Sequence, residues 1–186
     1  MNISAVLLAG GESRRMGKDK ATLLFGEKPL WQIQLDLLRK LEPAEILVSA
    51  RKDPSWRPDD IRFVADESPS RGPLSGLAAS LVQIRTGHML ALAIDMPFMN
   101  EEHLRSLCRQ IHPGRGVLQV IGNRAEPLAA IYPVEAHVDF VAALSGADFS
   151  MQALTARLVE TGKLRAVQVS KDDEGFYRNL NEPADF

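Results

Sequence analysis

Short runs of apolar residues recur along the chain, and longer segments with apolar residues at helical spacing lie between them. The short runs predict β-strands at residues 3–8, 45–49, 62–65, 89–94, 117–121 and 128–132, and a last strand is expected at 163–170. Up to Ile94 the runs are continuous rather than alternating. Continuous runs are typical of strands that are buried on both faces of a parallel sheet.

Helices are expected between these strands. The first begins near Pro29, which suits a first helical turn, and ends before Pro43. Another begins at Asn100, a good N-cap residue, with Glu101 and Glu102 in the first turn, where carboxylates favour the helix dipole. Further helices are predicted at residues 74–84, 139–145 and 151–161.

The alternation of strands and helices is typical of βαβ units. It predicts an α/β fold with a mainly parallel central sheet. The 186 residues are enough for one domain with a full-sized core. Because the sequence contains no internal repeat, low-complexity tract or linker, we expect a single domain over residues 1–186.

Composition and charge are those of an ordinary soluble globular protein, with 45% hydrophobic and 25% charged residues. A formal net charge of −2 gives no overall attraction to nucleic acid or acidic membranes, so neither is expected as a partner. The N-terminus lacks a basic leader with an apolar segment, and no uncharged apolar stretch approaches about 18 residues. These features predict a cytoplasmic protein.

The lone cysteine and the histidines offer little chemistry. Cys108 falls on the helical apolar spacing of Leu104, Leu107 and Ile111, which favours a small core residue over a nucleophile. The four histidines show no paired spacing with cysteine or with each other. We therefore expect no zinc site.

The segment LLAGGESRRMGKDKATL, residues 7–23, follows the first predicted strand and carries the clearest chemistry. Gly10 and Gly11 permit positive φ and let backbone N–H groups approach an anion, while Arg15 and Lys20 can add charge-assisted bonds to phosphate oxygens. In open α/β folds, ligands bind at this edge of the sheet. The segment indicates a triphosphate site; the alternative is a glycine turn with a solvated basic face.

Two common phosphate-binding motifs do not fit this loop. A P-loop requires G-x-x-x-x-G-K-[ST], but Gly17 comes one residue too late after Gly11, and Asp19 follows Lys18. The dinucleotide fingerprint G-x-G-x-x-G fails because Glu12 follows the paired glycines. The loop therefore belongs to neither class.

A carboxylate ends the apolar run MLALAI at the same edge of the predicted sheet. Asp95 follows this run, and Pro97 blocks simple continuation of the strand. A carboxylate in this place can hold Mg²⁺ against a triphosphate, since Mg²⁺ prefers hard oxygen ligands. An Asx turn or an N-cap-like role is the alternative.

The segment LAGGESRRMGKDK resembles the signature of the molybdenum cofactor guanylyltransferases. The resemblance continues, in the family's order, in GPLSGL (72–77), IDMPF (94–98), EPLAAIYP (126–133) and NLNEP (179–183). It implies a Rossmann-like three-layer fold of the nucleotide-diphospho-sugar transferase type. It also implies transfer of GMP from GTP to the terminal phosphate of molybdenum-molybdopterin, release of pyrophosphate, and Mg²⁺ as cofactor.

The resemblance also assigns residues. Lys20 would neutralise charge on the phosphates, Arg15 would bind the leaving pyrophosphate, and Asp95 would hold Mg²⁺. The positions that match nucleotide-binding residues are Leu8, Ala9, Gly10, Gly11, Lys20, Ser49, Asp66, Gly72 and Asp95. The positions that match acceptor-binding residues are Asn179 and Asn181.

Several of these positions keep a second interpretation. Asp66 ends a predicted strand and suits the base or ribose, or is a solvated loop acid. Ser49 stands where some relatives carry an asparagine that contacts nucleotide. GPLSGL places glycines against the nucleotide or forms a plain helix start with Pro73 at the first position. The asparagines near Pro183 suit an acceptor site or an ordinary turn.

Alternative functions follow from the same residues. One alternative is a cytidylyl or sugar-phosphate nucleotidylyltransferase, which would have the same fold but another substrate. Another is a protein that is not an enzyme, a non-catalytic nucleotide-binding or cofactor-delivery module. Leu8-Ala9-Gly10-Gly11 favours guanine, because cytidylyl relatives more often have alanine at the third position. Molybdoenzymes or other cofactor-assembly proteins are the protein partners that the resemblance implies.

Overall fold

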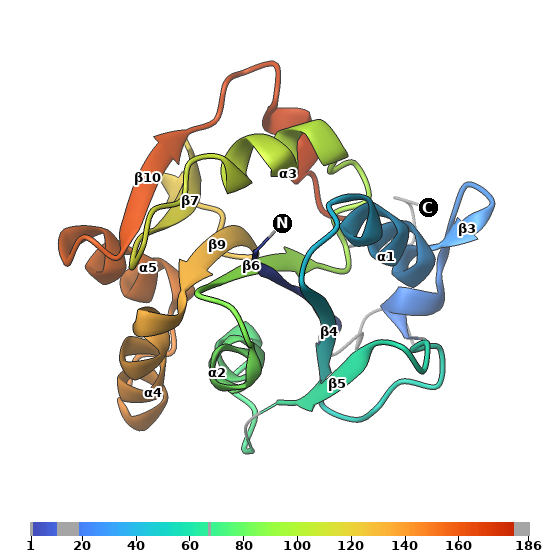
Figure 1. Ribbon diagram of the computed structural model, residues 1–186, viewed down its shortest axis with the longest axis horizontal. Helices are drawn as coiled ribbons and strands as arrows, with labels where there is room; N and C mark the ends of the chain where they lie inside the picture. The colour runs from blue at the N-terminus through green and yellow to red at the C-terminus, as the bar shows by residue number, and fades with distance from the viewer. Residues whose placement is uncertain (1, 11–18, 67, 181–186) are drawn as a thin grey trace.

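The computed structural model describes residues 2–10, 19–66 and 68–180. Within them, an eight-stranded sheet runs in the order β10-β7-β9-β6-β1-β4-β5, with β8 paired to β7 (Figure 1). The strands are β1 (Ser4–Leu8), β4 (Glu45–Ala50), β5 (Arg62–Ala65), β6 (His88–Ala93), β7 (Gly116–Ile121), β8 (Arg124–Ala125), β9 (Ala129–Pro133) and β10 (Leu164–Gln168). The predicted strands are therefore present, with bounds that differ by one or two residues.

The half of the sheet that carries β6, β1, β4 and β5 is entirely parallel. All five residues of β1 are buried, as its continuous apolar run predicts. Leu8 at its end is in register with Ser49 of β4 and Ala93 of β6. The carboxyl ends of three neighbouring strands therefore meet at one edge, which is where ligands bind in open α/β sheets.

The other half of the sheet is mixed. β9 pairs antiparallel with both β6 and β7, whereas β10 runs parallel to β7. The short β7–β8 hairpin and the few residues before β9 leave no room for a crossover helix, and a parallel connection needs a dozen or more residues. The sheet is mostly parallel, as predicted, and the reversal at β9 is a feature that apolar runs do not encode.

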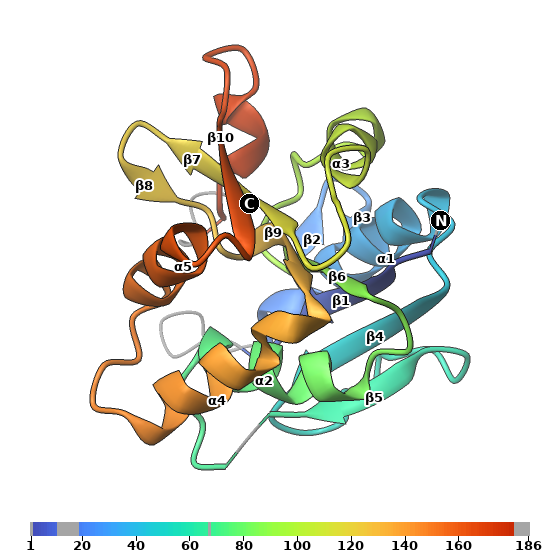
Figure 2. The same cartoon turned by 60° about the vertical axis from the view of Figure 1, so that its left-hand side comes forward.

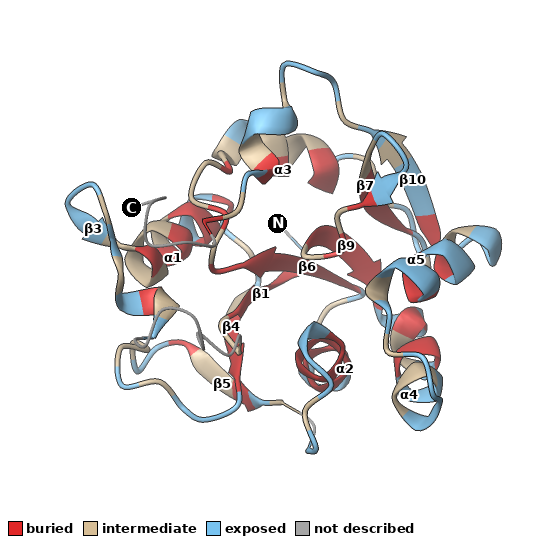
Figure 3. Ribbon diagram, turned by 180° about the vertical axis from the view of Figure 1, so that it is seen from behind, coloured by how far each residue is buried: buried red, intermediate tan, exposed pale blue. Residues whose placement is uncertain are grey.

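Helices cover both faces of the sheet and give the expected three layers (Figures 1 and 2). Alternate residues of β1 divide between two cores: Ala5 and Leu7 pack in the first, and Val6 and Leu8 in the second. Helices α1 (Leu30–Lys40) and α3 (Glu101–Cys108) contribute to the first core. Helices α2 (Pro73–Gln83), α4 (His137–Ser145) and α5 (Met151–Glu160) contribute to the second. The buried strands lie between these layers (Figure 3).

Some local predictions need correction. Pro29 is not inside the first turn of α1: it is the N-cap residue and ends β3 (Lys28–Pro29), which pairs with β2 (Leu24–Phe25). Short 3₁₀ helices were also not anticipated; they are η1 (Lys20–Thr22), η2 (Val134–Ala136) and η3 (Glu174–Tyr177). Each is a single turn, too short to leave a periodic apolar pattern.

One further prediction is confirmed. Cys108 is 7% exposed in the first core, and burial raises the pKa of its thiol to about 11, so it is a core residue. In the described part of the chain, no helix is both long and apolar enough to cross a bilayer.

Candidate active site

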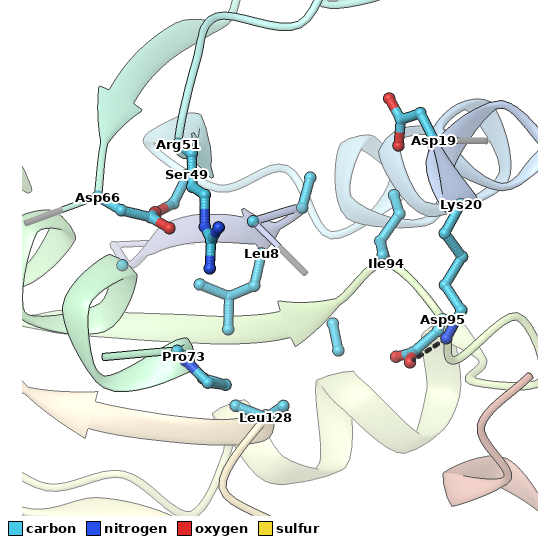
Figure 4. Close-up of a pocket in the computed structure, with 15 residues that line it drawn as sticks. Leu8, Asp19, Lys20, Ser49, Arg51, Asp66, Pro73, Ile94, Asp95 and Leu128 are labelled. Carbon is cyan, nitrogen blue, oxygen red and sulfur yellow. Dashed lines mark hydrogen bonds and ion pairs between the residues drawn. The ribbon is translucent and has the colours of Figure 1, made fainter. Parts of the chain in front are cut away.

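A pocket of about 420 Å³ opens at the carboxyl edge of the parallel strands (Figure 4). The described residues that line it come from the ends of β1, β4, β5 and β6, from η1, from the start of α2 and from the residue before β9: Leu8, Ala9, Gly10, Asp19, Lys20, Ser49, Arg51, Asp66, Gly72, Pro73, Gly76, Ala93, Ile94, Asp95 and Leu128. Charged side chains lie at its two ends, and apolar ones lie between them (Figure 4).

One end of the pocket holds an ion pair between Lys20 and Asp95. The Lys20 Nζ lies 2.9 Å from the Asp95 Oδ2, and the two side chains are only 17% and 20% exposed. Lys20 begins η1, which is capped by Asp19 through a hydrogen bond from the Ala21 N–H. The second carboxylate oxygen of Asp19 accepts a hydrogen bond from the Trp56 indole. These contacts fix the turn that presents Lys20.

The C-terminal segment lies beside this ion pair. The Leu180 N–H donates to the Asp95 backbone oxygen over 3.0 Å. The preceding residue, Asn179, has a buried Oδ1 for which the described residues supply no hydrogen-bond partner. A buried amide oxygen without a partner is costly and suits a group that meets a ligand. Asn179 is not among the residues that line the pocket, but its neighbour Leu180 bonds the backbone of Asp95, which does line it.

Asp66 occupies the opposite end of the pocket. It directly follows β5, and its Oδ1 accepts a hydrogen bond of 2.9 Å from the Ser49 hydroxyl. Burial raises the pKa of the Asp66 carboxyl, against the lowering effects of the Ser49 hydrogen bond and of the nearby Arg51 charge. Ser49 thus contacts Asp66 directly and orients it.

Two glycines leave room for the Asp66 carboxylate. A Cβ on Gly10 would lie 2.5 Å from the Asp66 Oδ2, and a Cβ on Gly76 would lie 2.6 Å from the Ser49 Oγ and 3.0 Å from the Asp66 Oδ1. Gly72 is the N-cap residue of α2, with φ at 68°, and Pro73 follows at the first helical position as expected. Gly76 is within α2 and not before it, so the two glycines of GPLSGL have different tasks.

The structure brings most of the predicted nucleotide-binding residues to one pocket. Leu8, Ala9, Gly10, Lys20, Ser49, Asp66, Gly72 and Asp95 all line it. Gly11, Arg15 and Asn181 lie outside the described residues. Sequence reasoning missed Asp19 and Arg51 among the charged lining residues. Gly76, the second glycine of GPLSGL, lines the pocket as one interpretation of that segment expected, and Arg51 had a signal in its place two residues after Ser49.

The side chains around the pocket show how the expected Mg²⁺ could be bound. Among the described residues no group of three His, Cys, Asp or Glu side chains could hold a metal ion. Mg²⁺ usually keeps several waters and binds through one or two carboxylates together with substrate phosphates. The single carboxylate of Asp95 is enough for binding of this kind. The residues present therefore suit a Mg²⁺ ion that enters with a triphosphate.

Comparisons with known proteins agree on one family. A family model described as the MobA-like NTP transferase domain matches residues 5–162. A probable molybdenum cofactor guanylyltransferase from Opitutus terrae is 33% identical over 186 residues, which cover 98% of this chain and 92% of that protein. A molybdenum cofactor guanylyltransferase from Cereibacter sphaeroides is 33% identical over 196 residues, which cover 100% of this chain and 94% of that protein.

Solved structures share the fold. The molybdopterin-guanine dinucleotide biosynthesis protein A from Archaeoglobus fulgidus superposes with a TM-score of 0.77 at 22% identity. The match covers 98% of this chain and 94% of that one. At this identity the likeness shows the fold alone, and it confirms the Rossmann-like α/β architecture expected from the sequence.

Proposed function

The chain belongs to the family of MobA-like NTP transferases, and on that premise we propose that it transfers GMP from GTP to the terminal phosphate of molybdenum-molybdopterin. Pyrophosphate leaves, and a molybdopterin guanine dinucleotide forms. The observation that carries the proposal is the polarity of one pocket. At one end, the ion pair of Lys20 and Asp95 is suited to bind phosphates. At the other end, the Asp66 carboxylate, which accepts a hydrogen bond from Ser49, is suited to bind a base.

The reaction is a displacement at the α-phosphorus of GTP. An oxygen of the acceptor phosphate attacks it, and the bond to the β-phosphate oxygen breaks. Few protein groups are needed, because positioning and charge stabilisation supply most of the rate in phosphoryl transfer. The ammonium of Lys20 is placed to neutralise charge that develops on the phosphates. This assignment rests on its position at the pocket end.

Asp95 is the residue that would hold Mg²⁺. When bound, the metal orients the phosphates and withdraws charge from them. Since Lys20 now pairs with Asp95 over 2.9 Å, entry of a metal-bound triphosphate gives each partner a new counter-charge. Lys20 would then bind phosphate oxygens, and Asp95 would hold the cation.

The acceptor is assigned to the side of Asp95 that carries the C-terminal segment. The hydrogen bond from Leu180 to the Asp95 backbone holds Asn179 there, and its buried Oδ1 suits a donor group on the acceptor. Acceptor identity and the molybdoenzymes or cofactor-assembly proteins that receive the product rest on the family alone.

Pyrophosphate release tests this function. The protein is mixed with GTP, CTP, ATP or UTP in turn, with and without molybdenum-molybdopterin and Mg²⁺, and with Asp95→Asn as the inactive control. We expect release that needs acceptor and metal and prefers GTP by about 100-fold, because a site built for one base leaves polar groups unpaired with another. Preference for CTP, or release only with a sugar phosphate, would identify another transferase. Nucleotide binding without release would indicate a non-catalytic module.

A further inference from the structure

The end of the pocket proposed to bind the base carries a hydrogen-bond donor, Arg51, as well as an acceptor, Asp66. Lys20 and Arg51 are the basic side chains among the described lining residues, and Lys20 lies at the phosphate end. Arg51 directly follows β4, and its exposed side chain lies at the pocket rim. Figure 4 shows its guanidinium on the same side of the pocket as Asp66 and Ser49, directed toward Leu8.

The parallel register explains why Arg51 and Asp66 are neighbours. Ala50 of β4 pairs with Ala65 of β5, and the Asp66 N–H donates to the Ala50 oxygen over 3.0 Å. Arg51 and Asp66 are therefore the residues that directly follow two adjacent strands. Their charges interact, because the Arg51 charge lowers the pKa of the Asp66 carboxyl. The backbone thus places a guanidinium beside a carboxylate.

This juxtaposition matches the polar edge of guanine. The base presents the N1–H and the N2 amino group as donors, next to O6 and N7 as acceptors, and arginine binds O6 and N7 in a bidentate manner. We propose that Arg51 is a specificity-determining residue that binds O6 and N7 of the guanine, while Asp66 accepts from N1–H and the N2 amino group. The proposal rests on the proposed function and adds the residue that reads the base.

Adenine and cytosine fit this pair poorly. Adenine has an acceptor at N1 and an amino donor at C6, so its acceptor faces Asp66 and its donor faces Arg51. Cytosine likewise has an acceptor at N3 beside an amino donor at C4. Groups of like polarity then oppose each other in a pocket from which water is displaced, which is a strong form of rejection.

Nucleotide analogues test the contact in the full-length protein. We would measure Kd by calorimetry, with Mg²⁺ and without acceptor, for GTP, for 7-deaza-GTP, which lacks the N7 acceptor, and for ITP, which lacks the N2 amino group. The proteins are wild type, Arg51→Met, Arg51→Lys and the matched control Lys52→Met, an exposed neighbour that does not line the pocket.

We expect wild type and Lys52→Met to bind 7-deaza-GTP about tenfold more weakly than GTP, as for a lost hydrogen bond to a charged group. Arg51→Met loses the contacts to both O6 and N7, so it should bind GTP more than about tenfold more weakly and no longer distinguish it from 7-deaza-GTP. Its penalty for ITP should be unchanged, since that contact belongs to Asp66. Arg51→Lys should keep only part of the discrimination, because lysine lacks the planar fork.

Two outcomes would overturn the assignment. One is a full 7-deaza penalty in Arg51→Met. The other is weaker binding of pyrophosphate alone in Arg51→Met, which would place the guanidinium on phosphates. A wild-type protein that prefers CTP to GTP would instead contradict the proposed function, so the two failures are distinguishable.

Discussion

Gly10→Ala is a substitution for which the structure predicts a specific loss of GTP binding. The new Cβ would lie 2.5 Å from the Asp66 Oδ2, and ordinary van der Waals contact begins at 3.4 Å. The carboxylate must therefore move by about 0.9 Å. Its other oxygen is held by the Ser49 hydroxyl at 2.9 Å and lies over Gly76 within α2. Little space is available for retreat.

The size of the effect follows from the hydrogen bonds at stake. Moving the carboxylate breaks its bond to Ser49 or turns its free oxygen away from the base. A buried polar group left without a partner costs about 1–3 kcal/mol, which corresponds to about 5- to 150-fold in affinity. GTP binding should weaken by this factor. Binding of pyrophosphate, which uses the other end of the pocket, should stay near wild type.

Calorimetric Kd values for GTP and pyrophosphate measure the effect. Gly87→Ala is the matched control, because Gly87 is exposed and a Cβ there meets nothing within 4 Å. A direct clash of the new methyl group with the base is the competing explanation. Asp66→Ala separates the two routes: in that background Gly10→Ala should cost nothing further if it acts through the carboxylate. An unchanged GTP affinity in the single variant would refute the reasoning.

Other substitutions test the remaining parts. Asp95→Asn should keep the melting temperature near wild type and lower turnover by about 100-fold or more, because an amide is a poor ligand for Mg²⁺; activity within a few-fold of wild type would remove Asp95 from the site. Asp66→Asn should abolish discrimination for GTP yet raise the free energy of unfolding at pH 7. Burial raises the pKa of Asp66 in the folded state, so its ionisation costs stability as pH rises above the ordinary value of 3.8, and the gain should vanish below it. Burial lowers the pKa of His103, whose Nε2 lies 2.7 Å from the Tyr177 hydroxyl. As pH drops, the unfolded chain therefore binds the proton before the folded protein does, and the free energy of unfolding should fall below about pH 6.5. Urea titrations at pH 7.5 and 5 measure this difference, which should be absent in His103→Gln.

The fold was largely predictable because burial on both faces leaves a strong signal. The continuous apolar runs that form β1 and β6 gave the parallel half of the sheet nearly to the residue. The direction of β9 was not predictable from its apolar run, since a buried strand reads alike in either direction. Its reversal follows from the short connection after β7, and the hairpin β2–β3 is too short for any periodic pattern.

The candidate site divides in the same way. A general rule, that ligands bind where parallel strands end, indicated that Asp66 and Asp95 belong to one edge. The rule says nothing about which side chains touch each other. The hydrogen bond from Ser49 to Asp66 spans 17 residues and the ion pair of Lys20 and Asp95 spans 75. Such contacts depend on strand register and on glycines that leave space, which composition and spacing do not specify.

The partly buried charges at the two ends of the pocket are stabilised in different ways. Lys20 and Asp95 neutralise each other, so neither charge lies unpaired in the half-buried phosphate end. A triphosphate with its metal carries both kinds of charge and can replace each partner in turn, so binding exchanges one paired arrangement for another. Among the described residues, the Ser49 hydroxyl and the nearby Arg51 charge offset the burial of Asp66, and burial still raises the pKa of its carboxyl. In the proposed complex the hydrogen-bond donors of guanine would relieve that penalty, so the gain on binding would be larger for guanine than for adenine or cytosine. Selectivity would then follow from a carboxylate whose burial the described residues offset incompletely.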